Sequence, residues 1–389
     1  MEQTKVQIIK ETDALTDALL TISHYLRDNP ETAYQEHKAC EYLSGFLEQQ
    51  GFEVQRGAGS VETAFAARPT GYKPSRPCVA ILAEYDALPK IGHGCGHNLI
   101  AAASMGAAVA LARTLGDLAN NVVVVGTPAE EGGGGKARLY DAGVFDGVDA
   151  AMMFHPGHLN LPGKGMLGRT KFKMEFFGKT SHASGSPDKG INALDALVAA
   201  YTHINALRQH LLPDARIHGI ITDGGDAPNI IPDYAAGMFY VRAASLAYRD
   251  KLFAQVQHCA EGAALATGAE VKITVEPPTI DPFKPNLPLE EAARINLEAL
   301  GVSIDADDGK RGSSDIGNLS QHIPCIHAYL KIVDPDSPAH STAFAQATDT
   351  DLGQKAMLNA AKMIAMTAYD YLTSAALREK TATAFGNTD

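Results

Sequence analysis

Residues 78–98 read CVAILAEYDALPKIGHGCGHN, a short apolar run followed by a glycine-rich turn. The run is too short for a helix and ends in turn residues, which is typical of a strand buried on both faces. An alanine-rich helical stretch follows at 99–115. This alternation predicts an α/β domain with a mostly parallel sheet. Three more apolar runs continue it: NVVVVGTPAEE (121–131), DAAMMFHPG (149–157) and IPCIHAYL (323–330).

A different rhythm occupies residues 169–278, where four strand patterns alternate with two helical stretches. Their order, βαββαβ, is typical of a ferredoxin-like α+β domain. The chain has 389 residues, more than the ~250–300 at which one hydrophobic core stops growing. We therefore predict a discontinuous catalytic domain over 1–168 and 279–389, with the ferredoxin-like domain inserted into it.

The composition excludes several classes of protein. A net charge of −12 repels phosphate backbones, so nucleic acid is not an expected partner. The first twenty residues mix charges and lack the apolar core of a signal peptide. The apolar stretch 99–111 is shorter than the ~20 residues that span a bilayer. Five scattered cysteines, an odd number, do not suggest disulfides. We expect a cytoplasmic protein with no membrane partner.

Each apolar run delivers a polar residue at its carboxyl end, where open sheets collect their ligands. Any one of these residues alone is more often structural or solvated than a ligand. Together they offer thiolate, imidazole and carboxylate donors, a mixture suited to zinc, manganese or nickel rather than calcium or magnesium. The predicted metal ligands are Cys95, His97, one of the adjacent pair Glu130 and Glu131, His155 and His340.

Three details refine this prediction. Cys95 lies just before the alanine-rich helix, where the helix dipole and nearby cations would stabilise a thiolate. Glu130 and Glu131 are adjacent, which is costly unless a cation or proton is shared, so one could bind metal and the other hold a water. Asp86 is a plausible partner that orients a ligand histidine.

The same residues allow three rival interpretations. The GGGGK run ending at Lys136 resembles a phosphate loop, but Glu130 stands at its first glycine position and no Ser or Thr follows the lysine. Cys95 could be a catalytic nucleophile, yet no oxyanion arrangement is recognisable. A metal-free binding or scaffolding protein with the same fold is the alternative from another class.

The inserted domain adds three candidates for substrate contact. His182 lies in GKTSHASGSPDKG, on a loop after the first small strand. Asn229 in APNIIP and Arg242 in FYVRA supply an amide and a guanidinium, which grip a carboxylate by directed hydrogen bonds.

Between Glu84 and Phe344 the chain carries an ordered set of motifs: EYDALP, GHGCGHN, GTPAEEGGGGK, FHPG, GKTSHASGSPDKGINALDA, APNIIP, YVRA, RGSSDIGNLS and PAHSTAF. In this order they resemble the aminoacylase, hippuricase and desuccinylase metallopeptidases of family M20, amidohydrolase subfamily. The resemblance is greatest to the branch of p-aminobenzoyl-glutamate hydrolases and of dipeptidases acting on basic dipeptides. It implies a zinc-peptidase-like catalytic domain with a lid and dimerisation domain, and hydrolysis of the amide bond in dipeptides or small N-acyl amino acids.

The resemblance also implies roles for individual residues. Cys95 would bridge two divalent metals, zinc or manganese with nickel possible, and Glu130 would be the general base. His182 would enter the active site of the partner subunit in a homodimer formed through the lid. Asn229 and Arg242 would hold the carboxylate of the substrate. The remaining metal ligands would be His97, Glu131, His155 and His340.

Three positions depart from relatives. Glu84 stands where many members of the wider family have a metal-binding histidine, and Cys95 stands where they have a bridging aspartate. Asn98 replaces the aspartate of hippuricase-like members.

Overall fold

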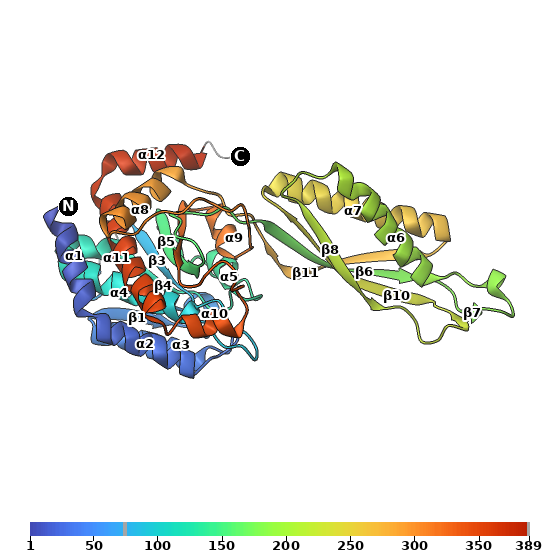
Figure 1. The fold of residues 1–389 in the computed structure, drawn as a ribbon, viewed down its shortest axis with the longest axis horizontal. Coiled ribbons are helices and arrows are strands. Elements are labelled where there is room, and N and C mark those ends of the chain that lie inside the picture. The colour runs from blue at the N-terminus through green and yellow to red at the C-terminus, as the bar shows by residue number, and fades with distance from the viewer. Residues whose placement is uncertain (73–75, 387–389) are drawn as a thin grey trace. The chain divides into compact units, whose positions relative to one another are not determined.

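A computed structural model describes residues 1–72 and 76–386. The chain forms two compact units, drawn in Figure 1. Unit one comprises Met1–Gly165 and Lys284–Asp389, and unit two comprises Met166–Phe283. The predicted boundaries of the inserted domain, at 169 and 278, fall inside unit two.

The sheet of unit one contains the four strands predicted from the apolar runs. These four are parallel to one another, while β1 and β2 extend the sheet in antiparallel pairing. All residues of β3 and β4 are buried, so both faces of the sheet are covered. In sheet order the strands are β1 (Phe52–Arg56), β2 (Phe65–Pro69), β4 (Val122–Gly126), β3 (Val79–Ala83), β5 (Ala150–Gly157) and β12 (Cys325–Lys331).

Helices cover this sheet. α4 contacts β3, and α11 packs against α4 and β5. α3 contacts β1 and β2 and ends shortly before Gly51, whose φ of 85° suits glycine. The longer helices of the unit are α1 (Gln3–Ala14), α2 (Thr16–Asp28), α3 (His37–Gln49), α4 (His97–Leu115), α8 (Leu287–Ala299), α11 (Asp351–Thr373) and α12 (Ala375–Gly386). The shorter ones are α5 (Gly135–Asp141), α9 (Ile316–Ser320) and α10 (Thr342–Ala347).

The alanine-rich helix is longer than the apolar stretch that predicted it. Together with the 3-10 turn after it, the helical segment His97–Asn121 is long and apolar enough to cross a membrane by length and composition. However, 72% of its most apolar window is buried inside the protein, as in a core helix. Its first fifteen residues, from His97 to Leu111, are all buried.

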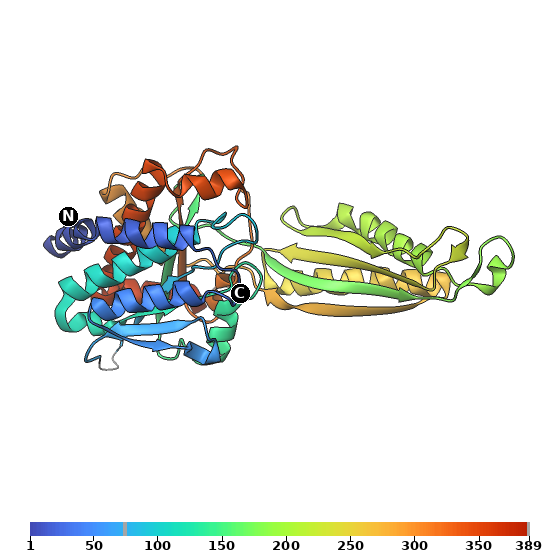
Figure 2. The same cartoon turned by 90° about the horizontal axis from the view of Figure 1, so that it is seen from below.

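Unit two has the predicted βαββαβ order. Its antiparallel sheet runs β11-β6-β10-β8, and both helices pack on one face of it, as Figure 2 shows. Burial along β6 alternates, so its other face is partly exposed. A small two-stranded sheet pairs β7 (Ser181–His182) with β9 (Ile230–Ile231). The main elements are β6 (Gly168–Phe177), α6 (Ala193–Leu207), β8 (Arg216–Asp223), β10 (Tyr234–Ala243), α7 (Leu246–Thr267) and β11 (Glu270–Ile280).

Candidate metal centre

The candidate metal ligands come together at the carboxyl end of the parallel sheet. Cys95 lies on the turn that follows β3, and His97 is the first residue of α4. Glu131 follows β4, and His155 lies near the end of β5. His340 follows β12 on a loop that is tied to the glycine-rich turn, because the His340 amide donates a hydrogen bond of 3.0 Å to the Gly94 carbonyl.

The ligand atoms form two groups that share one residue. The ligand atoms of Cys95, His97 and His155 lie within 4.8 Å of one another, and so do those of Cys95, Glu131 and His340. A third such group, His97 with Glu130 and Glu131, overlaps both. Two neighbouring positions for a cation, joined at the Cys95 sulfur, fit this arrangement.

Hydrogen bonds fix how His97 and His155 face this cluster. Nδ1 of His97 lies 2.8 Å from the backbone oxygen of Asp86, which can only accept, so this nitrogen carries the proton. Nδ1 of His155 donates to the Pro156 carbonyl at 2.7 Å. Nε2 of each ring is therefore the ligand atom. The Asp86 carboxylate also accepts from the Glu131 amide at 2.9 Å, so Asp86 orients two candidate ligands.

The cluster carries polar atoms that a cation would satisfy. Nε2 of His97 and Oε1 of Glu131 are buried and have no hydrogen-bond partner among the residues that the structure describes. Burial alone would lower the pKa of His97, but the surrounding carboxylates, Asp86 first, raise it well above its usual value. Burial and the charges of Glu84 and Glu131 raise the pKa of Glu130 well above its usual value. An interior with this excess of negative charge fits divalent cations.

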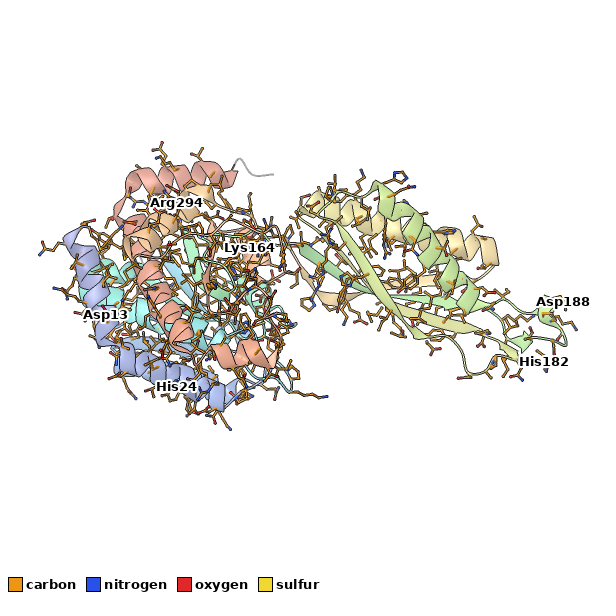
Figure 3. All side chains as sticks on the ribbon, in the orientation of Figure 1. Asp13, His24, Lys164, His182, Asp188 and Arg294 are labelled. Carbon is orange, nitrogen blue, oxygen red and sulfur yellow. The ribbon has the colours of Figure 1, made fainter. Side chains whose placement is uncertain are left out.

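His182 and Asn229 lie together in unit two. His182 pairs with Ile230 across the small β7–β9 sheet, and the Ala183 amide donates to the Asn229 carbonyl at 3.0 Å. Nδ1 of His182 accepts from the Gly185 amide at 3.1 Å, so the proton of the neutral ring is on Nε2. Figure 3 labels His182 at the β7 end of the unit.

Arg242 lies at the opposite end of the four-stranded sheet of unit two. It pairs with Arg169 at the start of β6, whereas Tyr234 at the other end of β10 pairs with Phe177. The two ends are separated by the ten residues of β10, or about 30 Å. Within one chain, therefore, Arg242 does not share a site with His182 and Asn229.

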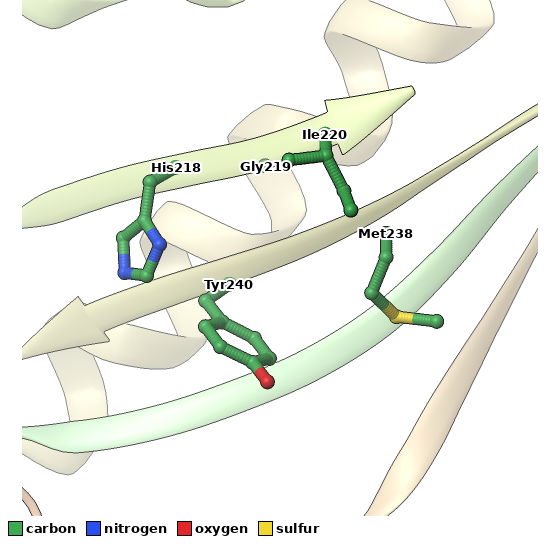
Figure 4. A pocket seen from close by; sticks show the side chains of 5 residues that line it. All are labelled: His218, Gly219, Ile220, Met238 and Tyr240. Carbon is green, nitrogen blue, oxygen red and sulfur yellow. The ribbon is translucent and has the colours of Figure 1, made fainter. Parts of the chain in front are cut away.

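A cavity of about 260 Å³ opens on the exposed face of the four-stranded sheet of unit two, close to Arg242. Nε of Arg242 donates to Nε2 of His218 at 3.3 Å, and the guanidinium lies 5.7 Å from the centre of the Tyr240 ring. Burial and the neighbouring Arg169 lower the pKa of Arg242. Figure 4 shows the residues that line the cavity: His218, Gly219, Ile220, Met238 and Tyr240.

Comparisons with known proteins agree with this geometry. The profile of "Peptidase family M20/M25/M40" matches residues 80–369. The chain belongs to this family. It is 38% identical to the Xaa-Arg dipeptidase of Mus musculus over 97% of the chain and 91% of that protein. It is 29% identical to one of the subunits of the p-aminobenzoyl-glutamate hydrolase of Escherichia coli (strain K12), over 92% of the chain and 90% of that protein.

The fold comparison points the same way. A Bacillus subtilis protein described as a dinuclear metal binding peptidase of the M20 family superposes with a TM-score of 0.74 at 22% identity, over 92% of this chain and 99% of that chain. The fold class and the family predicted from the motifs are confirmed. As a member of the M20 family the chain is a hydrolase, which disfavours the metal-free binding protein.

The surroundings of Cys95 separate the two effects that were expected to stabilise its thiolate, the dipole of α4 and nearby cations. Burial and the nearby carboxylates, Glu131 first, raise the pKa of this thiol. The effect of the helix end is outweighed by the surrounding negative charge. A divalent cation would reverse this balance, because it deprotonates a coordinating thiol outright.

The glycine run after Glu131 serves the backbone rather than a phosphate. Gly132 has a φ of 136°, which L side chains rarely adopt. A Cβ atom on Gly135 would clash with the Pro128 carbonyl oxygen, so only glycine lets α5 approach the loop that carries the two glutamates. Glu36, which the sequence did not single out, accepts a hydrogen bond of 3.0 Å from the amide of Ala129 at this turn.

Lys136, the lysine of the rejected phosphate-loop motif, is completely buried. Its ammonium binds Oε1 of Glu84 and lies 2.6 Å from Oδ1 of Asp315. Burial by itself would lower the pKa of Lys136, but Asp315 and Glu84 raise it above its usual value. This ion network was not predicted from the sequence, although Asp315 lies in the quoted motif RGSSDIGNLS.

Proposed function

We propose that the chain hydrolyses the amide bond of dipeptides or small N-acyl amino acids at a two-cation centre, with Glu130 as general base. The observation that carries this proposal is the pair of ligand groups joined at Cys95, with Glu130 adjacent to them. His97 and His155 would hold one cation with Cys95, and Glu131 and His340 would hold the other.

Divalent cations bound there would lower the pKa of a water molecule and polarise the substrate carbonyl. Glu130 borders the candidate ligand groups, since Oε2 of Glu130 is 3.9 Å from Nε2 of His97. Its carboxylate would take a proton from water as the carbonyl is attacked. It would then deliver this proton to the leaving amine.

His182 and Arg242 are proposed to contact the substrate. The Nε2–H of His182 can donate a hydrogen bond to the oxyanion that develops on the carbonyl, because Nδ1 is occupied by backbone donors. Arg242 would bind the carboxylate of the substrate. Like charges directly opposite each other in a sheet are destabilising, and a bound carboxylate would relieve the repulsion between Arg242 and Arg169.

A homodimer would explain why Arg242 and the pair His182 and Asn229 lie at opposite ends of the four-stranded sheet. One copy would supply Arg242, and the partner copy would supply His182 and Asn229. The outer edge of β8 offers a surface for such pairing, because β8 is the last strand of the sheet and Ile220 and Ile221 are 64% and 45% exposed. We propose that the dimer forms through this edge.

The substrate and the metal are proposed from similarity and charge. The chain is more similar to an Xaa-Arg dipeptidase than to a p-aminobenzoyl-glutamate hydrolase. A net charge of −12 also attracts cationic substrates. We therefore expect dipeptides with C-terminal Arg or Lys to be preferred. The mixture of thiolate, imidazole and carboxylate donors favours zinc or manganese as the metal. The cytoplasm is proposed as the location.

A substrate panel tests this function. Full-length protein loaded with zinc or manganese would be incubated with basic dipeptides, N-acyl amino acids and p-aminobenzoyl-glutamate, and the released amino acid would be measured. Release from the basic dipeptides, abolished by a chelator, is expected. A chain that holds two cations and cleaves none of these substrates contradicts the proposal.

A further inference from the structure

One carboxylate near the metal centre has no assigned role. Glu84 follows β3 and is completely buried. Its two oxygens have different environments: Oε1 binds the ammonium of Lys136, while Oε2 has no hydrogen-bond partner among the described residues. This second oxygen lies 3.5 Å from Nε2 of His97, the nitrogen that faces the cluster.

These two buried atoms, Nε2 of His97 and Oε2 of Glu84, lie 3.5 Å apart, and neither has a hydrogen-bond partner among the described residues. A carboxylate oxygen without a partner is costly in a dry interior. A cation bound at Nε2 of His97 would give this oxygen an attractive partner.

Lys136 holds Glu84 in this position. The lysine is clamped from its other side by Asp315, whose second oxygen also accepts from the Lys136 amide at 2.8 Å. All three side chains are completely buried, so none can turn toward water. The network therefore fixes where Oε2 of Glu84 points, as buried polar networks do when their members are paired.

From this geometry we propose that Glu84 is a positioning residue of the metal centre, held by Lys136 and Asp315, that strengthens cation binding at the group formed by Cys95, His97 and His155. The proposal rests on the proposed two-cation function. Its effect should be specific to one of the two cation positions. Glu84 faces His97, and only one of the two groups joined at Cys95 contains His97.

The test compares two variants that each remove one charge from the same lysine. Glu84→Gln and Asp315→Asn both keep side-chain shape, but only Glu84 faces His97. Chelator-treated full-length protein would be titrated with Zn²⁺ or Mn²⁺ in competition with a fluorescent chelator. In Glu84→Gln, one of the two affinities should fall ~10–100-fold, the range found for residues that support metal ligands. In Asp315→Asn, both affinities should stay within about threefold of the wild type, well below that range.

Each outcome is decisive. Equal affinities in Glu84→Gln and the wild type overturn the proposal, and so does an equal loss in both variants, because the network would then act only as a whole. If Glu84→Gln does not fold by circular dichroism, the triple variant Glu84→Gln/Lys136→Met/Asp315→Asn replaces it, since neutralising an entire buried ion network is often tolerated. That variant should show the same loss at one position, and wild-type affinities in it overturn the proposal. A wild-type chain that binds fewer than two cations instead contradicts the proposed function.

Discussion

Glu130 and Glu131 are chemically identical neighbours to which the proposed function gives different tasks. Glu131 belongs to a ligand group with Cys95 and His340, whereas Glu130 belongs to neither of the groups joined at Cys95. Glu130→Gln should therefore keep both cations and lose turnover by ~10²–10⁴-fold, the usual contribution of a general base. Turnover of a basic dipeptide and metal content by mass spectrometry would be measured together.

Glu131→Gln is the matched control for this prediction. It should lose about one cation per chain, because it replaces a charged ligand by a neutral amide. Equal cation contents in the two variants, or near-normal turnover in Glu130→Gln, would show that the two roles are assigned wrongly.

Cys95 provides a spectroscopic prediction about the metal centre. Its thiol is buried among carboxylates that raise its pKa, so it should become a thiolate only when a cation binds. Adding Co²⁺ to the chelator-treated protein should produce a thiolate-to-cobalt charge-transfer band in the near ultraviolet, and Cys95→Ser should abolish it. Cys325→Ser, which changes another buried thiol, should leave the band intact. A band that persists in Cys95→Ser would exclude the proposed bridge.

The residues that gather at the centre could be predicted because each follows an apolar strand. Parallel strands bring such residues to one edge whatever their distance in sequence. The network of Lys136 could not be predicted in this way. Its partners lie 52 and 179 residues away, and a buried lysine looks like a solvated one in sequence. The charge around Cys95 could not be predicted from its position before α4, because burial and carboxylates that follow another strand, Glu131 first, raise the pKa of its thiol.

At the scale of elements, periodicity was a sound guide to strands and helices. The four buried apolar runs form the four parallel strands of unit one, and the strand patterns of the inserted domain form the four-stranded sheet of unit two. The ends of elements were less predictable. The alanine-rich helix begins at His97, two residues before its apolar stretch, and both added residues are buried. It ends at Leu115, four residues after the stretch, where Arg113 is exposed.

The exposed edge of β8 makes a prediction at this scale. If β8 forms the dimer contact, Ile220→Lys places a charge in the interface and should shift the sedimentation of the protein toward monomer. Leu265→Lys is a suitable control, since Leu265 is an apolar residue of α7 that is 87% exposed in the same unit. A dimer that survives Ile220→Lys but not Leu265→Lys would place the interface on the helices instead.

At the scale of the whole molecule, the decisive fact is that the candidate substrate contacts are divided between the two ends of β10. Arg242 lies at the end where the chain enters β6 from unit one, and His182 and Asn229 lie beyond the other end. The sequence could suggest each of these residues. It could not reveal their separation, because that depends on the direction in which each strand runs through the sheet.

Complementation between two inactive variants tests whether His182 serves the neighbouring protomer. Glu130→Gln lacks the proposed base and His182→Ala lacks the proposed oxyanion donor, so each homodimer should be nearly inactive. After the two proteins are mixed and exchange protomers, a heterodimer would contain one site with Glu130 from its own chain and His182 from its partner. That site should be active.

At equal concentrations and with random exchange, about half of the dimers would be heterodimers, each with one of its two sites intact. If the sites act independently, activity should therefore rise on mixing to roughly a quarter of the wild-type value per chain. Protomer exchange would be verified by mass spectrometry of differently labelled chains. If exchange is complete and the mixture stays as inactive as its components, His182 acts in its own chain or has no part in the reaction.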